Sequence, residues 1–209
     1  CSKVFLLRNF PLLAGNNNAK PEYTDKDCLD LVYIGGVNEY RGLRESAMYV
    51  QAFNEKYCPS KMITLTVYAD ANKFVDEAIK YNSVYHRPWV DYNVLLEELK
   101  HFDIGVCLLK DIVKFQRNLP LKNFDYMAVG LPIITSNFGG IKKYALLSGS
   151  AICIDPDSYK EFEEAVLTLF DASVRERLGE NGKKYVREAA SFENEAGNYL
   201  SFIGQHSSN

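Results

Sequence analysis

Short, apolar, β-rich segments recur along this 209-residue chain, and amphipathic helical segments separate each one from the next. The apolar segments lie at residues 29–36, 62–69, 83–87, 103–109, 131–136 and 149–154. Each is continuously apolar and does not alternate with polar residues, which is typical of parallel strands covered on both faces. The helical segments between them lie at residues 39–56, 72–81, 91–101, 119–129 and 140–147. This order predicts an α/β fold with a Rossmann-like, doubly wound parallel sheet.

The two ends of the chain depart from this alternation. At the start, "KVFLLRNFPLL" predicts a strand and "AGNNNAKPEYTDKDC" a polar linker. We therefore expect residues 1–28 to be a hinge strand and linker from an N-terminal domain that this chain lacks, followed by a Rossmann-like domain at 29–157. Residues 158–209 read as helices and are expected to pack on that domain as a helical tail, with Gly179 and Gly182 at the joins between helices.

Charge and composition exclude several classes of protein. The 24 basic and 27 acidic residues give a net charge of -3 without a block of like charge, so nucleic acid is not expected as a partner. No apolar run reaches the ~18 to 20 residues that cross a bilayer, and no basic region precedes a long apolar one. The five cysteines are scattered, with no metal-binding spacing, and are expected to be reduced thiols. A cytoplasmic protein without a membrane span is therefore expected.

Familiar catalytic motifs are missing from the sequence. It contains no G-x-x-x-x-G-K-[ST], G-x-G-x-x-G, H-E-x-x-H or G-x-S-x-G, and its three histidines have no metal-binding spacing. P-loop enzymes, ordinary dinucleotide dehydrogenases and zinc hydrolases are therefore improbable. What remains is the crevice beyond the carboxyl ends of the strands, where open α/β sheets bind ligands.

The first strand ends in "GGVNEYRG". Gly35 and Gly36 allow a ligand to approach the backbone closely, and Arg41 can reach an anionic group. The alternative is a tight strand-to-helix turn that carries an exposed arginine.

The helix expected at 119–129 combines a polar stripe with a buried face. If it starts near Asn118, then Asn118, Lys122 and Asp125 share one face at spacings i, i+4 and i+7. Asn118 is a suitable N-cap, and the free N–H groups of the first turn, together with Lys122, would suit a phosphate. Asp125 could accept hydrogen bonds from a pair of sugar hydroxyls. The alternative is a solvated face on which Lys122 and Asp125 form an i,i+3 ion pair.

Two further segments are weaker candidates. Gly139 and Gly140 in "SNFGGIKKY" precede a helix and are a second candidate phosphate cradle. In "HRPWVDY", the side chains of His86, Trp89 and Tyr92 could stack on a base, although a lone tryptophan more often lies in a core or an interface.

The order of these parts resembles the C-terminal, donor-binding domain of GT-B type retaining glycosyltransferases, specifically glycosyltransferase family 4 (glycosyl transferases group 1). The resemblance spans about residues 29–202. It depends on "YIGGVNEYRG", "DIGVCLLK", "LPLKNFDYMAVGLPIITSNFGG", "ICIDPDSYKEFEEAV" and "LGENGKKYVRE", in that order. The third segment is the most specific, because the family commonly shows a Pro-x-Lys-x-Phe-acid-Tyr-Met-Ala-x-Gly-x-Pro string there.

The resemblance implies transfer of a sugar from a nucleotide-diphosphate donor to a glycan or lipid-linked acceptor, with retention and with no obligatory metal or cofactor. It implies that Arg41 contacts the donor diphosphate, that Lys122 lies near the phosphates or the sugar, and that Asp125 holds the ribose diol. The acceptor site would lie on the missing N-terminal domain, and the full-length protein would be peripheral at the membrane at most.

The sequence departs from the family pattern at three positions. Arg117 stands where the first Glu of the family's Glu-x7-Glu pair would fall, and is expected to serve the phosphates instead. Asp125 is one methylene shorter than the family's Glu, and Gly36 stands where many members carry a basic residue.

These arguments predict the following site residues, which are catalytic (Arg41, Arg117, Lys122) or donor-binding (Gly35, Gly36, Trp89, Val90, Asn118, Leu119, Asp125, Gly139, Gly140). Two other functions remain open. One is a sugar-nucleotide epimerase of the same architecture, and the other is a non-catalytic nucleotide-sugar-binding module.

Overall fold

The computed structural model describes residues 5–13, 23–117 and 119–206. Within these ranges the strands form one parallel sheet of six, in the order β3-β2-β1-β4-β5-β6. The strands are β1 (Cys28–Ile34), β2 (Met62–Tyr68), β3 (Val84–Arg87), β4 (Ile104–Cys107), β5 (Ile133–Ser136) and β6 (Ala151–Ile154). All six predicted strands and their parallel pairing are confirmed.

Helices connect the strands and continue after the last one. They are α1 (Leu43–Tyr57), α2 (Lys73–Ala78), α3 (Tyr92–Leu99), α4 (Val113–Gln116), α5 (Leu121–Val129), α6 (Gly139–Ser148), α7 (Tyr159–Leu169), α8 (Ala172–Ala189) and α9 (Phe192–His206). In the described part of the chain, no helix combines the length and apolar character that a bilayer crossing requires.

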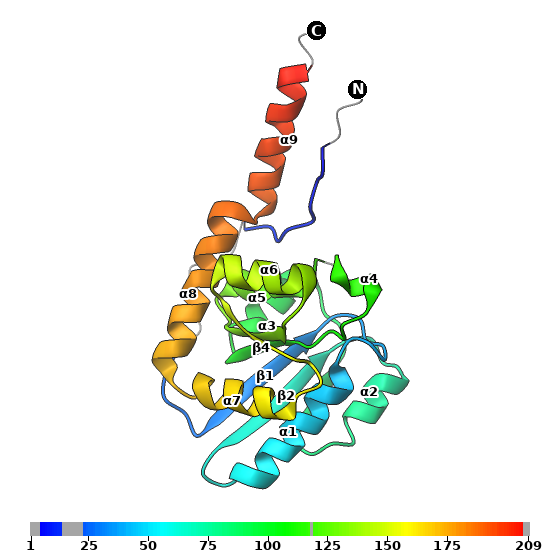
Figure 1. Cartoon of the computed structure of the whole chain (residues 1–209), viewed down its shortest axis with the longest axis vertical. Coiled ribbons are helices and arrows are strands. Elements are labelled where there is room, and N and C mark those ends of the chain that lie inside the picture. Colours follow the sequence, from blue (N-terminus) through cyan, green and yellow to red (C-terminus); the bar gives the residue numbers. More distant parts are fainter. Residues whose placement is uncertain (1–4, 14–22, 118, 207–209) are drawn as a thin grey trace.

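Helices cover both faces of the sheet, as Figure 1 shows. Alternate residues of β1 divide between two cores because successive side chains of a strand point to opposite faces. Leu31 and Tyr33 pack into the core that includes α1, α2 and α7. Val32 and Ile34 pack into the core that includes α3, α5 and α8. The predicted doubly wound, Rossmann-like fold is confirmed.

Two local predictions about helices were wrong. The helix expected from residue 39 starts at Leu43, because Gly42 adopts a φ of 70° at its N-cap and a side chain there would meet the backbone of Leu108. The short helix α4 was missed, because four residues are too few to show a helical period.

Gly179 and Gly182 were expected to separate helices, but both lie in the middle of α8. A Cβ at Gly179 would meet the Gly130 carbonyl oxygen and the Tyr23 hydroxyl, and one at Gly182 would lie 3.2 Å from the Met127 Cα. These glycines therefore allow α8 to approach α5 closely. The two glycines, which suggested helix ends in the sequence, are thus required for close packing inside one helix.

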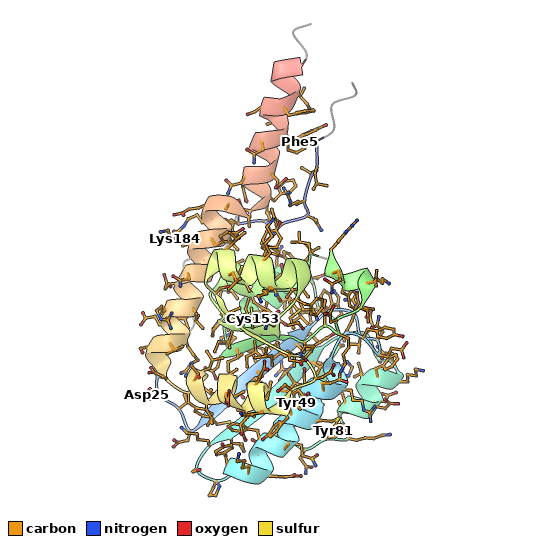
Figure 2. The ribbon with its side chains drawn as sticks, in the orientation of Figure 1. Phe5, Asp25, Tyr49, Tyr81, Cys153 and Lys184 are labelled. Atoms are coloured by element: carbon orange, nitrogen blue, oxygen red, sulfur yellow. The ribbon has the colours of Figure 1, made fainter. Side chains whose placement is uncertain are left out.

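The described part of the N-terminal segment, residues 5–13, is not the predicted strand. It runs beside α9, which extends away from the sheet (Figure 1). Phe5 faces this helix (Figure 2), and its ring centroid lies 5.5 Å from that of Tyr199. Nearer the sheet, the Phe192 N–H donates to the Pro11 carbonyl, and Arg8 forms a 3.1 Å ion pair with Glu195. The segment is not a strand, because it packs on a helix and not on the edge of a sheet.

Candidate functional site

A cleft of about 350 Å³ opens at the carboxyl ends of β1 and β4. These strands are neighbours in the sheet although β2 and β3 come between them in the sequence, so the chain reverses its winding direction here. Open α/β sheets bind ligands at such a switch point. The cleft is lined by Ile34, Gly35, Arg41, Trp89, Cys107, Leu109, Leu119, Pro120, Leu121, Lys122 and Asp125.

The first turn of α5 forms one wall of the cleft. The helix begins at Leu121 with Pro120 as its N-cap residue, and no side chain among the residues described makes a capping bond there. The prediction of a start near Asn118 was wrong, because the proline and not the asparagine sets the start. Asn118 itself lies outside the described residues. Lys122 and Asp125 remain together on this helix at i and i+3, and both line the cleft.

The ammonium group of Lys122 is buried without a hydrogen-bond partner among the described residues. It lies 3.6 Å from the centroid of the Tyr33 ring, which offers a weak attraction to a cation. Burial, and to a lesser extent the positive charge of Arg41, lower the pKa of Lys122 to about 8. The charge of Asp125 opposes this shift, but no hydrogen bond reaches the ammonium from the described residues. Because a buried cation without a hydrogen-bonded partner is costly, the site favours an anion that would bind to it directly.

Arg41 lies opposite Lys122, on the loop that follows β1. The Tyr33 hydroxyl donates to the carbonyl of Gly36 at 3.1 Å and to that of Arg41 at 3.4 Å, so one buried ring supports this loop and faces Lys122. A Cβ on Gly36 would lie 3.9 Å from Arg41 Nη1, and one on Gly35 would lie 3.9 Å from Lys122 Cε. Two glycines therefore border two cations. The structure brings together the predicted residues Gly35, Gly36, Arg41 and Lys122.

Asp125 lies one turn further along α5. One of its oxygens, Oδ1, accepts a hydrogen bond of 2.7 Å from the Tyr92 hydroxyl at the start of α3. Burial raises the pKa of Asp125 to about 6, although the Tyr92 hydrogen bond and the charge of Lys122 both oppose this effect. The carboxylate is therefore charged at neutral pH and has a second oxygen available.

A second cavity of about 460 Å³ adjoins the cleft and shares Trp89, Leu121 and Asp125 with it. Its other lining residues are Asn9, Phe10, Pro11, Leu12, Tyr92, Leu95 and Phe192. Apart from Asn9, Tyr92 and Asp125 this lining is apolar, so the space suits a flat or apolar group. Trp89, which was predicted to stack on a base, lies where the two cavities meet.

Other predicted residues lie elsewhere. Leu119 lines the cleft, but the described lining does not include Val90, which packs against the core, or Arg117, which is exposed after α4. Gly140 lies with Gly139 at the start of α6, also outside the lining.

The start of α6 meets a different neighbour. A side chain at Gly139, which has a φ of 51°, would meet the backbone of Gln116. Gly139 thus allows α4 and α6 to pack closely. His86, which was predicted to stack on a base, instead bonds through Nε2 to the Ala69 carbonyl at 2.9 Å.

The sequence argument missed several residues of the cleft wall, among them Cys107 and Leu109 at the end of β4. Nothing distinguishes such residues from core residues in the sequence, although the end of a strand next to β1 could have marked them. Cys28, Cys58, Cys107 and Cys153 are free thiols, as expected. Within the described ranges, no group of three or more His, Cys, Asp or Glu side chains is placed to hold a metal ion.

Comparisons with known proteins give a family and a fold. The family model described as glycosyl transferases group 1 matches residues 28–172, which is more than half of the chain. No curated protein sequence matches significantly.

Solved structures resemble the chain at low sequence identity. TarM superposes with a TM-score of 0.72 at 12% identity, over 96% of this chain and 39% of TarM. Sucrose-phosphate synthase from Thermosynechococcus elongatus gives a TM-score of 0.69 at 16% identity, over 94% of this chain and 49% of that one. WaaG, a glycosyltransferase involved in lipopolysaccharide biosynthesis, gives 0.64 at 18% identity, over 83% and 47%. The likeness concerns the fold, and the chain spans less than half the length of each protein.

Proposed function

Because the chain belongs to the glycosyl transferases group 1 family, we propose that it is the donor-binding part of a retaining glycosyltransferase. The reaction would transfer a hexosyl group from a nucleotide-diphosphate sugar to a glycan or lipid-linked acceptor, in cytoplasmic polysaccharide biosynthesis. One observation carries the proposal: the buried ammonium of Lys122, which has no hydrogen-bond partner among the described residues, faces a cleft that it shares with Arg41, at the first turn of α5.

The diphosphate of the donor would lie against this pair of cations. The N-terminus of a helix carries a partial positive charge and free N–H groups, so α5 adds to the attraction. Gly35 and Gly36 leave room for phosphate oxygens beside Arg41 and Lys122. The ribose would then reach Asp125, and the base would extend past Trp89 into the apolar cavity.

The same groups would assist the reaction. As the glycosidic bond breaks, negative charge grows on the departing diphosphate, and fixed cations in the cleft would stabilise that charge. Arg41 and Lys122 are in place before the substrate arrives, so little reorganisation is required. We therefore propose that the reaction has no obligatory metal ion.

Nucleotide binding tests this proposal. We expect UDP, GDP or ADP to raise the melting temperature of the chain. At a hundredfold excess over the dissociation constant, the ligand should increase the free energy of unfolding by about 2.7 kcal/mol. Lys122→Met and Arg41→Gln should each weaken that binding at least about tenfold, because each removes a charge-assisted contact. Affinities would be measured by isothermal titration calorimetry.

Lys142→Gln is the matched control, because Lys142 lies on α6, outside the described lining of the cleft. This variant should bind like the wild type. Binding that is lost in Lys142→Gln but kept in Lys122→Met would move the phosphate site to α6. The proposal fails if no nucleoside diphosphate or nucleotide sugar binds to the wild type.

A further inference from the structure

Lys122 and Asp125 have the spacing at which opposite charges on a helix ordinarily pair, yet the described structure keeps them apart. Residues at i and i+3 are neighbours on the helix surface. The Lys122 ammonium has no hydrogen-bond partner in the described part of the chain, whereas Asp125 accepts its 2.7 Å hydrogen bond from Tyr92. The carboxylate is thus held by a different helix, α3.

Tyr92 binds the Asp125 carboxylate from the apolar cavity and not from the cleft. Tyr92 lines the apolar cavity and is not among the residues that line the cleft, whereas Asp125 borders both spaces. The phenol therefore bonds Oδ1 from the apolar cavity, whose lining includes neither Lys122 nor Arg41. Oδ2 and one lone pair of Oδ1 remain for a ligand.

We propose that Tyr92 is a positioning residue that prevents a Lys122–Asp125 ion pair and so keeps both groups available to the donor. This inference rests on the proposed function, because it assigns the phosphates to Lys122 and a sugar diol to Asp125. With the phenol in place, the cation meets the phosphates and Oδ2 meets the hydroxyl pair. Without it, the carboxylate turns towards the ammonium, and each group neutralises the other.

A merely structural role for Tyr92 is the competing explanation. The bond between Tyr92 and Asp125 joins α3 to α5, and a hydrogen bond between two helices stabilises the fold whatever its neighbours do. The two explanations differ in what happens to Lys122. Only the positioning role makes the effect of Tyr92 on Lys122 depend on the Asp125 carboxylate.

A double-mutant cycle measured with inorganic pyrophosphate separates the explanations, because this probe has phosphates and no ribose. Tyr92→Phe should weaken pyrophosphate binding roughly 5- to 10-fold, since Asp125 then pairs with Lys122. In the Asp125→Asn background the same Tyr92→Phe change should have almost no effect. An equal loss in both backgrounds, or no loss in either, would overturn the inference.

The titration of Lys122 gives a second readout that needs no ligand. Arg41, Cys107 and Asp125 are the groups whose charges act on the ammonium, and Tyr92 acts through Asp125. Carbon NMR of the Lys122 side chain should show that Tyr92→Phe raises the pKa of Lys122 above about 8. An unchanged titration would contradict the inference even if the variant lost stability.

The outcomes also separate this inference from the proposed function. If the wild type binds neither pyrophosphate nor a nucleoside diphosphate, both fail. If the wild type binds both and Tyr92→Phe behaves like the wild type, only the role of Tyr92 fails. Tyr85→Phe is the matched control, because Tyr85 is an exposed tyrosine on β3, away from both cavities, and its replacement should leave affinity and titration unchanged.

Discussion

At the scale of single residues, the cleft holds charge that the free protein does not neutralise. Lys122 is buried beside a second cation, and the carboxylate of Asp125 is kept charged in a place that favours its protonated form. Both arrangements cost stability in the absence of a ligand. Such costs are typical of binding sites, where stability is lost in order to prepare the groups that a ligand needs.

This cost makes the stability of the free protein depend on pH. The pKa of Lys122 is lowered to about 8, so between about pH 8 and 10.5 the unfolded chain holds a proton that the folded chain has lost. Stability should therefore rise with pH in this range through Lys122. At pH 7, Lys122→Met should be more stable than the wild type by about 3 kcal/mol, and the difference should shrink towards pH 10.

Urea unfolding of both proteins at pH 7 and pH 10 measures this difference, and titrating groups that do not interact with Lys122 cancel in the comparison. If the difference in stability between the two proteins does not change with pH, the ammonium of Lys122 is either exposed or paired in solution, and the account is contradicted.

At the scale of helices and strands, close packing between α8 and α5 depends on Gly179. A methyl group there would meet the backbone of Gly130 and the hydroxyl of Tyr23. We expect Gly179→Ala to destabilise the protein by about 2 kcal/mol or more, because backbone cannot move aside as a flexible side chain can.

Gly197→Ala provides the control on a neighbouring helix. Gly197 lies in α9, and nothing lies within 4 Å of a Cβ built there. This change should stabilise by about 0.5 to 1 kcal/mol through helix propensity alone. Thermal and urea unfolding would show the two effects, and destabilisation of equal size at both glycines would contradict the packing account.

The sequence predicts helices and strands well where an apolar pattern repeats. It predicts them poorly where a contact with another part of the fold determines the local structure. The strands are short apolar runs that recur between helices, so their number and parallel pairing follow from the residues themselves. The start of α5 depends on one proline, α4 has no repeat to detect, and the glycines of α8 look like breaks until α5 is placed beside them. The apolar sequence of residues 5–13 predicts a strand, but the segment packs on α9 and not on the sheet.

At the scale of the whole molecule, the topology assembles the site. Because β1 and β4 are neighbours, the loop with Arg41 and the first turn of α5 face one cleft, although about 80 residues separate Arg41 from Lys122. The sequence predicts this meeting from the fold class. It does not predict the bond between Tyr92 and Asp125 or the apolar cavity between residues 9–12 and Phe192, because both depend on tertiary contacts without a local signal.

The most direct test of the central claim is a crystal structure of this chain with a nucleoside diphosphate. We predict that phosphate oxygens lie within hydrogen-bond distance of Lys122 Nζ and the Arg41 guanidinium, at the first turn of α5. Phosphates bound at the start of α6 beside Gly139, with the cleft between β1 and β4 left unoccupied, would contradict the account.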